Sequence, residues 1–316
     1  MIDEIEIDHF LDKVDPDNIR VYQPTSVFLV CGGPRDAASA TAPSLREAYL
    51  RICTNGSLKK HSALLAEDLT QLFETGSYRD FLTLESDIAQ IASLVVLFSE
   101  SYGSAAELGA FTITPAISDK LFAVIDDKRF SENSFIKLGP LLALQNAHGE
   151  SCVCVLNRHD INVQDIRDLR NMDLSAFHQI MQQSIDDRLK SVLEHSTFDR
   201  SQRGHLIKLI VGILQWYGAL TLDELEVCLL YFDLKIPREE IVNFLLCAEF
   251  VEWVVRDKRG TRTFFAAVAQ KMAVQFSFVD GLKINRLRWQ SEIRDIWKTK
   301  DAFRFNCITA AQAKAL

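Results

Sequence analysis

One segment of the 316-residue chain combines residue types that could act on a sugar or a phosphate. After an apolar run it continues through Gly103 and Ser104 to Glu107. A glycine lets the backbone approach a ligand closely, and the amides at a helix start can hold a hydroxyl or a phosphate. A carboxylate at that place can act as a nucleophile on the electron-poor carbon of a sugar. The spacing of Ser104 and Glu107 also fits a capping box, in which Glu107 would only stabilise the helix start.

The elements that position this segment follow from the order of the apolar runs. Short, continuously apolar runs are typical of strands buried on both faces, and helical spacing separates them here. The order strand, helix, strand, helix predicts an α/β fold with a Rossmann-like parallel sheet over residues 1–158. Ligands bind such sheets beyond the carboxyl ends of the strands. The predicted strands are residues 27–31, 62–65, 94–98, 121–125 and 151–156.

Composition and charge indicate a second domain of different character. Hydrophobic residues make up 48% of the chain and charged residues 25%, as in an ordinary globular protein. Residues 1–198 hold 17 Lys and Arg against 29 Asp and Glu, whereas residues 199–316 hold 18 against 14. This charge asymmetry suggests different partners for the two parts, and the basic part could meet nucleic acid.

The sequence also argues against several kinds of site. The seven cysteines are odd in number and mostly lie in apolar runs, so no disulfide framework is expected. The close pair Cys152 and Cys154 has no second pair and no histidine at zinc spacing, so no metal site is expected. No apolar run is long enough to cross a bilayer, and the acidic start does not resemble a secretory signal. We therefore expect a cytoplasmic protein without a membrane partner.

Residues 199–316 predict a mainly α-helical winged helix-turn-helix domain. A capping box of Thr221 and Glu224 opens the second helix, and Pro237 suits the first position of a third. A hairpin with a basic tip follows, which completes three helices and a wing. Residues 159–198 are predicted as a helical linker with an apolar stripe. The hairpin residues that we call the wing cations are Arg256, Lys258, Arg259 and Arg262.

The charges of this domain bear on nucleic-acid binding. The wing cations suit contacts with a phosphate backbone. The third helix suits a DNA groove poorly, because Glu239 and Glu240 near its start would repel phosphates. The sequence therefore favours docking to a nucleic-acid-containing complex over sequence reading, with a winged helix used only for protein contact as the alternative. A second basic strip comprises Lys283, Arg286, Arg288 and Arg294.

The segment around Glu107 resembles the active-site segment of the nucleoside 2-deoxyribosyltransferase superfamily. It reads LVVLFSESYGSAAELGAF at 94–111, a hydrophobic strand followed by a turn of the type Gly-Ser/Thr-x-x-Glu. The whole chain is more similar still to deoxyribosyltransferase-like effectors encoded beside retron reverse transcriptases. The further stretches that carry this resemblance are VFLVCGG at 27–33, EDL at 67–69, LE at 84–85, SFIKLGP at 134–140 and the tail at 282–305.

The resemblance implies a domain that breaks an N-glycosidic bond with Glu107 as the nucleophile. NAD is the first choice of substrate, because nicotinamide leaves without protonation; a purine nucleotide or deoxynucleotide is the second, and no separate cofactor is expected. True deoxyribosyltransferases carry an aspartate where Ser101 stands here, so hydrolysis and ribosyl transfer both stay open. Asp68, Glu85 or Asp126 could assist Glu107. The residues expected to bind the substrate are Gly32, Gly33, Asp68, Glu85, Tyr102, Gly103, Ser104 and Asp126.

The resemblance also implies a biological setting. The protein would be a toxic effector of a retron antiviral defence system, held inactive by the retron reverse transcriptase and its RNA-linked DNA (msDNA). A homo-oligomer or a larger ribonucleoprotein assembly is expected. The alternative is a nucleotide-sensing, winged-helix DNA-binding regulator without catalysis. The enzyme needs Glu107 in a pocket, whereas the regulator needs only the fold.

Overall fold

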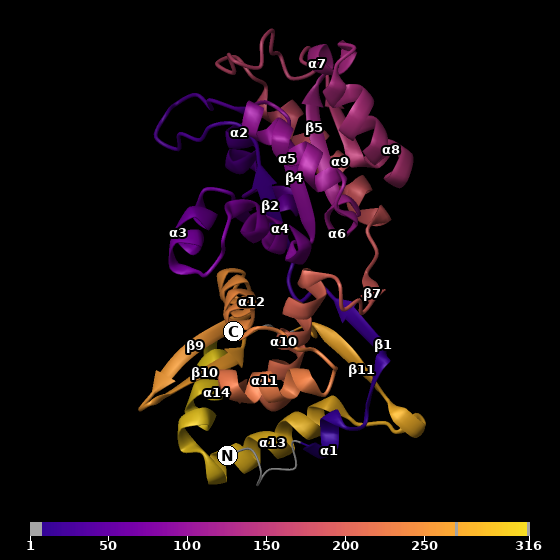
Figure 1. The fold of residues 1–316 in the computed structure, drawn as a ribbon. Helices are drawn as coiled ribbons and strands as arrows, with labels where there is room; N and C mark the ends of the chain where they lie inside the picture. Colours follow the sequence, from indigo (N-terminus) through magenta and orange to yellow (C-terminus); the bar gives the residue numbers. More distant parts are fainter. Residues whose placement is uncertain (1–7, 269–270, 315–316) are drawn as a thin grey trace. The chain divides into compact units, whose positions relative to one another are not determined.

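The chain forms two compact units, which we call the sheet unit and the terminal unit. A computed structural model describes residues 8–268 and 271–314 (Figure 1). Within these residues, every helix is too short or too polar to cross a lipid bilayer. The sheet unit comprises Ser26–Leu69 and Ile88–Leu193, and the terminal unit comprises Met1–Thr25, Thr70–Asp87 and Glu194–Leu316.

This division differs from the predicted domain boundaries at 158 and 198. Strand β1 (Val14–Tyr22) pairs antiparallel with β11 (Val274–Phe278) and with β7 (His195–Thr197). These pairings draw the start of the chain into the same unit as its end. Residues 159–193, predicted as a linker, belong to the sheet unit. The sequence could not reveal either feature, because strand partners far apart in a chain leave no local pattern.

The sheet unit is built on a five-stranded parallel sheet, which confirms the predicted α/β arrangement. Its strands are β2 (Val27–Cys31), β3 (Ser62–Leu65), β4 (Leu94–Phe98), β5 (Leu121–Asp126) and β6 (Val153–Leu156). Every residue of β2, β4 and β5 is buried, as expected for strands covered on both faces. The strand order is β3-β2-β4-β5-β6, so the connections leave in opposite directions between β2 and β4. Open α/β sheets bind ligands at such a switch point.

Helices cover both faces of this sheet (Figure 1). The boundaries between the units fall inside two of them, α3 (Asp68–Thr75) and α4 (Phe81–Ile91), so both units share these helices. The others are α2 (Leu45–Ile52), α5 (Tyr102–Thr112), α6 (Pro115–Ser118), α7 (Asp127–Ser131), α8 (Leu142–His148) and α9 (Leu174–Ser191). Shorter turns are the 3-10 segments Gly56–Lys60 and Glu150–Cys152 and the π-helical turn Lys137–Leu141.

Helices α2 and α9 pack on one face of the sheet. Phe177, Met181 and Ile185 of the predicted apolar stripe are fully buried there, in one core with strand residues such as Val30. The stripe therefore packs within the chain. Because side chains alternate along a strand, Cys31 faces the other side of the sheet. Helix α5 packs on β4 and β5 without joining the core of α2 and α9, which puts it on the face of Cys31.

The terminal unit contains two antiparallel sheets, of order β11-β1-β7 and β8-β10-β9. Thr221 and Glu224 form the predicted capping box, since the hydroxyl and the carboxylate each accept a hydrogen bond from the other residue's N–H. Pro237 precedes its helix as the N-cap, not as the predicted first residue. The remaining elements are α1 (Asp8–Leu11), α10 (Arg203–Tyr217), β8 (Ala219–Leu220), α11 (Leu222–Leu230), α12 (Arg238–Phe250), β9 (Val254–Arg259), β10 (Arg262–Ala267), the 3-10 turn Val279–Gly281, α13 (Arg286–Lys300) and α14 (Ala302–Lys314).

Candidate active site at the carboxyl edge of the sheet

Glu100 holds together the loops that follow β2 and β4 at the switch point. Its Oε1 accepts hydrogen bonds from the backbone N–H of Gly33 (2.9 Å) and Arg46 (3.1 Å), and its Oε2 accepts one from Leu45 (2.8 Å). The carboxylate thereby satisfies the amides at the start of α2. A Cβ at Gly33 would lie 2.9 Å from the Glu100 carboxyl carbon, and Gly32 is equally crowded, so both glycines have a packing reason. Sequence reasoning missed this role of Glu100, because its partners lie 54 to 67 residues away.

Helix α5 begins at Tyr102, before Ser104, and this decides whether Glu107 can cap the helix. Ser101 is the N-cap: its Oγ accepts a hydrogen bond from Ser104 N–H (3.1 Å), and Ser104 Oγ accepts one from Ser101 N–H (3.0 Å). The capping box is therefore Ser101 with Ser104, and the alternative in which Ser104 and Glu107 form the box is wrong. Ser104, expected to bind substrate, is buried and its hydroxyl is occupied in the cap. Glu107 lies one turn further along the helix, where it does not cap.

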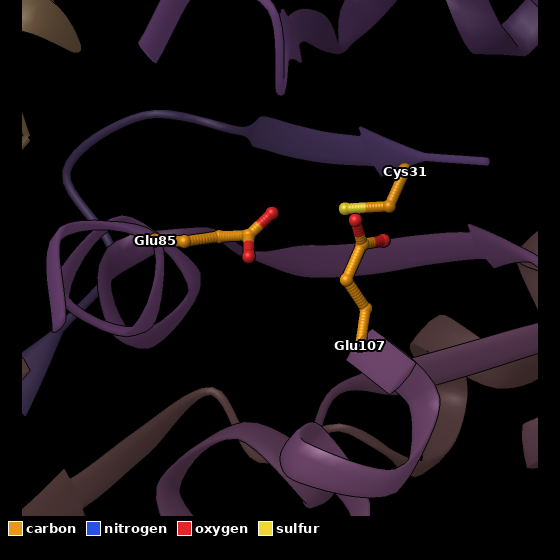
Figure 2. A group of neighbouring side chains, drawn as sticks. All are labelled: Cys31, Glu85 and Glu107. Atoms are coloured by element: carbon orange, nitrogen blue, oxygen red, sulfur yellow. The ribbon is translucent and has the colours of Figure 1, made fainter. Parts of the chain in front are cut away.

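Glu107 presents a half-buried carboxylate from α5, next to Cys31 of β2 (Figure 2). Its Oε2 is buried and accepts no hydrogen bond from the part of the chain that the structure describes. Burial raises the pKa of Glu107, whereas the charge of Arg46 and a hydrogen bond with the Cys31 thiol act to lower it and the charge of Glu67 acts to raise it. A poorly solvated carboxylate of this kind is stabilised when a positive charge forms beside it.

Glu85 is the second carboxylate near Glu107. It is buried on α4, one of the two shared helices. One side-chain ligand atom from each of Cys31, Glu85 and Glu107 lies within 4.8 Å of the others (Figure 2). Among the three carboxylates left open as partners of Glu107, Glu85 is the one found beside it. Thiol and carboxylate groups are also zinc ligands, so a metal ion would be sought here first, and the absence of a metal site stays a prediction.

Two arginines at this edge were not selected from the sequence. Arg46 is buried on α2 and donates to both carboxylate oxygens of Glu67 through its two terminal nitrogens. Burial acts to raise the pKa of Glu67, but hydrogen bonding and the charges of Arg46 and Arg35 hold it below its usual value. The only hint in the sequence was that Arg35 and Arg46 flank the start of the first helix after the double glycine.

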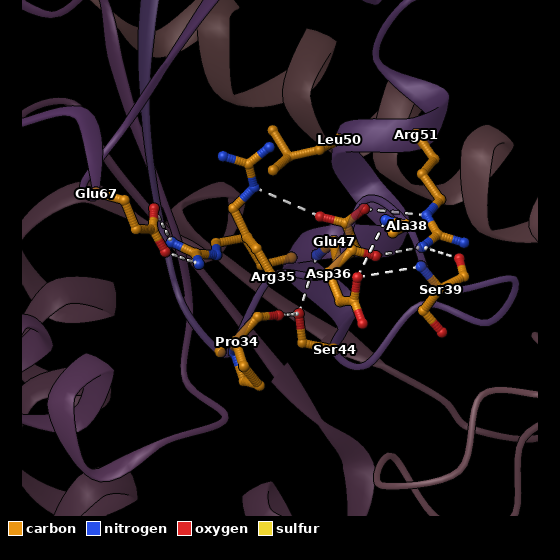
Figure 3. Close-up of polar contacts among 12 residues, drawn as sticks. Pro34, Arg35, Asp36, Ala38, Ser39, Ser44, Glu47, Leu50, Arg51 and Glu67 are labelled. Atoms are coloured by element: carbon orange, nitrogen blue, oxygen red, sulfur yellow. Dashed lines mark hydrogen bonds and ion pairs between the residues drawn. The ribbon is translucent and has the colours of Figure 1, made fainter.

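The loop after β2 and helix α2 line a pocket of about 440 Å³. Figure 3 shows the polar contacts among residues of this loop and helix. Arg51 orders this loop by donating to the carbonyl oxygens of Asp36 (3.0 Å) and Ser39 (2.9 Å). Glu47 pairs with Arg51 (3.1 Å) and with Arg35 (3.5 Å). Two guanidinium groups against one carboxylate leave the wall positive, which suits an anionic group. The lining residues are Arg35, Ala37, Ser39, Glu47, Leu50 and Arg51.

The other residues expected to bind substrate show different surroundings. Asp126 caps α7 by accepting a hydrogen bond from Arg129 N–H (3.2 Å), so part of its capacity has a structural use. Asp68 is exposed at the start of α3. Tyr102 is 98% exposed, which leaves its ring accessible to a ligand. A Cβ at Gly103 would meet no protein atom closer than 3.8 Å, so only a ligand would demand glycine there.

The wing cations lie on β9 and β10 of the terminal unit. Each of the three wing arginines pairs with a carboxylate of the same unit, at 2.8 to 3.0 Å. Lys258 is exposed and makes no ion pair within residues 8–268 and 271–314. In α12, Arg238 pairs with Asp223, and Asn243 accepts a hydrogen bond from Ser77 N–H. The helix in the place of a recognition helix thus has these polar residues occupied, and the wing is less basic than its sequence suggests.

Comparison with known proteins confirms the resemblance of the chain to retron effectors. Residues 42–256, more than half of the chain, match the family described as "STM3845 retron effector protein". The chain belongs to this retron effector family. Similar proteins from Escherichia coli include the "Retron Ec73 putative ribosyltransferase/DNA-binding protein", 29% identical over 141 residues, and the "Retron Ec86 putative ribosyltransferase/DNA-binding protein", 39% identical over 70 residues. These matches cover 43% and 22% of this chain and 42% and 23% of the relatives, so the chain spans less than half of the length of either.

Proposed function

We propose that this retron effector cleaves an N-glycosidic bond with Glu107 as the carboxylate nucleophile and NAD as the first choice of substrate. The observation that carries the proposal is the state of Glu107, whose Oε2 is buried without a hydrogen-bond donor from the described residues. Most buried polar oxygens in proteins have a hydrogen-bond partner. Buried oxygens of Glu47 and Asp126 also lack one, but these two carboxylates form ion pairs with arginines, whereas Glu107 forms none among the described residues. The word ribosyltransferase in the names of both relatives supports the same class of reaction.

In the proposed reaction a carboxylate oxygen of Glu107 bonds to the anomeric carbon while the bond from that carbon to the base nitrogen breaks. The electron pair goes to the base, so the cationic nicotinamide of NAD leaves as a neutral molecule without a proton. Water then attacks the anomeric carbon, the ester to Glu107 breaks, and a proton of the water passes to a protein carboxylate that acts as general base. We propose Glu85 as the acceptor of that proton, and its proximity to Glu107 supports this role. With a hydroxyl acceptor in place of water, the same sequence is ribosyl transfer.

The charges at the sheet edge favour a substrate that carries phosphate. Arg35 is 32% exposed in its side chain and faces the pocket of about 440 Å³ in the loop after β2. Its only ion-pair partner among the described residues is Glu47, which Arg51 already neutralises. A phosphate would gain a charge-assisted hydrogen bond there. NAD and nucleotides meet this requirement, whereas a plain nucleoside does not.

For the terminal unit we propose a winged helix made of α10, β8, α11, α12 and the β9–β10 hairpin. Its elements follow the order of that fold, with α12 in the place of the recognition helix. The occupied residues of α12 and the paired wing arginines favour docking over sequence reading. We propose as partners the retron reverse transcriptase and its RNA-linked DNA, which would keep the effector inactive in a larger assembly.

Replacement of Glu107 by glutamine tests the proposed reaction. Full-length wild type and Glu107→Gln are incubated with NAD, AMP and dAMP, and the products are resolved by chromatography. Wild type is expected to release nicotinamide from NAD, and the variant none, because an amide is no nucleophile. Glu132→Gln, an exposed glutamate of the same unit, is the control that keeps activity. Because Glu107 must be ionised and its pKa is raised, activity should fall on acidification at a higher pH than for an ordinary glutamate.

The alternative is a nucleotide-sensing DNA-binding regulator without catalysis. The term DNA-binding in the names of both relatives favours it. Release of adenine from AMP or dAMP, without release of nicotinamide from NAD, would support the proposed N-glycosidase activity with a nucleotide as its substrate. If no compound releases a base and the protein binds DNA in a sequence-specific way, the regulator hypothesis would be supported and the enzyme hypothesis rejected.

A further inference from the structure

A second pocket, of about 430 Å³, lies in the terminal unit between α10, α13 and α14. Its volume is in the range of small-molecule sites, about 300–1,000 Å³. Arg286 and Arg294, two members of the basic strip on α13, line it together with apolar side chains that include Leu214, Ile293 and Ile308. All lining residues belong to the terminal unit, so this pocket shares no residue with the edge around Glu107.

The two arginines of the pocket have no anionic partner among the residues that the structure describes. None of the described lining residues is an aspartate or a glutamate. Arg286 makes no ion pair or hydrogen bond through its guanidinium within the described residues, and burial lowers its pKa. Arg294 lies over the ring of Phe305, 5.4 Å from its centroid. By contrast, Arg288 on the same helix pairs with Glu292 at 2.7 Å in solvent. A partly desolvated cation without a counter-charge is costly, and a bound anion offsets that cost.

The rest of the wall offers neutral donors and flat apolar surface. Trp216 is 4% exposed, and its indole Nε1–H has no acceptor among the described residues. Gln290 and Gln312 also line the pocket, and Gln290 Nε2 already donates to the carbonyl oxygen of Gln215 at 2.7 Å. Planar guanidinium groups match the geometry of phosphate oxygens, and aromatic or apolar walls accept the flat faces of a base. Inorganic phosphate alone would leave the apolar wall uncovered.

We propose that this pocket binds a phosphorylated nucleoside. Arg286 and Arg294 take the phosphate, and the wall that contains Trp216 takes the base. The ligand is either a free mononucleotide or the terminal nucleotide of a nucleic-acid strand, which share this chemistry. The site does not depend on the proposed function, because it needs neither Glu107 nor bond cleavage.

Intrinsic tryptophan fluorescence isolates this pocket from the sheet unit. The four tryptophans of the chain, at positions 216, 253, 289 and 297, all lie in the terminal unit. The full chain with Glu107→Gln, which avoids turnover, is titrated with AMP, dAMP, adenosine and inorganic phosphate. A second series uses a single-stranded oligonucleotide with and without a 5′-phosphate. Saturable fluorescence change is expected with phosphorylated compounds only, and a response to AMP or to the 5′-phosphorylated strand identifies the source.

Arginine variants decide whether the signal arises in the pocket. Arg286→Met and Arg294→Met should each raise the Kd about ten- to hundredfold, as for loss of a hydrogen bond to a charged group. Arg288→Gln on the same helix should bind as wild type does. If Arg286→Met fails to fold, Arg286→Lys is used instead. It keeps the charge but loses the paired N–H donors of the guanidinium group, so it should still weaken binding. Equal binding of adenosine and AMP, no response to any phosphorylated compound, or wild-type affinity in the arginine variants would each overturn the proposal.

Discussion

Glu107→Gln should stabilise the protein while it abolishes base release. The Glu107 carboxylate is half buried, and its Oε2 has no donor among the described residues. A neutral amide of the same shape loses less solvation than a carboxylate. Single stabilising substitutions commonly raise the free energy of unfolding by about 0.5–2 kcal/mol, and we expect a gain of this size near pH 8. A buried charge that lowers the stability of the free protein is expected at Glu107 if that charge stabilises the substrate during the proposed reaction.

The pH dependence gives this prediction its sign. Burial raises the folded-state pKa of Glu107 above its unfolded value, so the folded protein holds this proton more tightly. The stability from this group is fully present below the unfolded pKa and is lost as the pH rises through the folded pKa. Each unit between the two pKa values corresponds to about 1.4 kcal/mol. The gain from Glu107→Gln should therefore be smallest near pH 4 and grow towards pH 8.

Urea denaturation followed by far-UV circular dichroism measures this difference. Tryptophan fluorescence is unsuitable here, because the sheet unit contains no tryptophan. The control is Glu132→Gln, an exposed change in the same unit that should leave the profile unaltered. A variant no more stable than wild type at pH 8, with the same pH profile, would refute the reasoning. It would mean that the folded protein already compensates the Glu107 charge.

Two further predictions concern other charged groups. Glu100→Gln should lower the free energy of unfolding by about 2–4 kcal/mol in the same denaturation assay, because an amide nitrogen would face the N–H of Leu45 in place of Oε2. A decrease below about 0.5 kcal/mol would contradict the role of Glu100 in holding the two loops together. Replacing Arg256, Lys258 and Arg259 by glutamine should weaken nucleic-acid binding in a salt titration and reduce its salt slope by about 0.7–0.9 for each phosphate that the variant no longer neutralises, with base release unchanged. An unaltered slope would show that the wing is not the docking surface.

Much of the fold could be predicted from local patterns. The strands 27–31, 62–65 and 94–98 have the predicted bounds, because a strand buried on both faces is a continuous apolar run of a strand's length. Their alternation with helices was enough to predict the parallel sheet, and ligand binding at its carboxyl edge stays a prediction. Thr221 and Glu224 show the same for capping, since both hydrogen bonds of that box lie within four residues.

The capping of α5 illustrates where local patterns stop. The segment contains Ser101, Ser104 and Glu107 at the same spacing of three, so it offers two overlapping capping boxes. Sequence alone favoured Ser104 with Glu107, while the structure uses Ser101 with Ser104. The choice depends on where the chain leaves β4, which the packing of the sheet sets. That choice releases Glu107 from the cap and leaves its carboxylate for chemistry.

The remaining features depend on contacts between residues far apart in the chain. Glu100 meets Gly33 and Arg46 across 67 and 54 residues, and β1 joins β11 near the other end of the chain. Such contacts follow from which elements pack together and leave no periodic trace in the sequence. The same holds for charge, because a count of wing cations cannot show which of them are already paired. Residue types and spacing therefore predicted the elements of the sheet and proposed a chemistry for its edge, and tertiary packing decided which side chains lie together there.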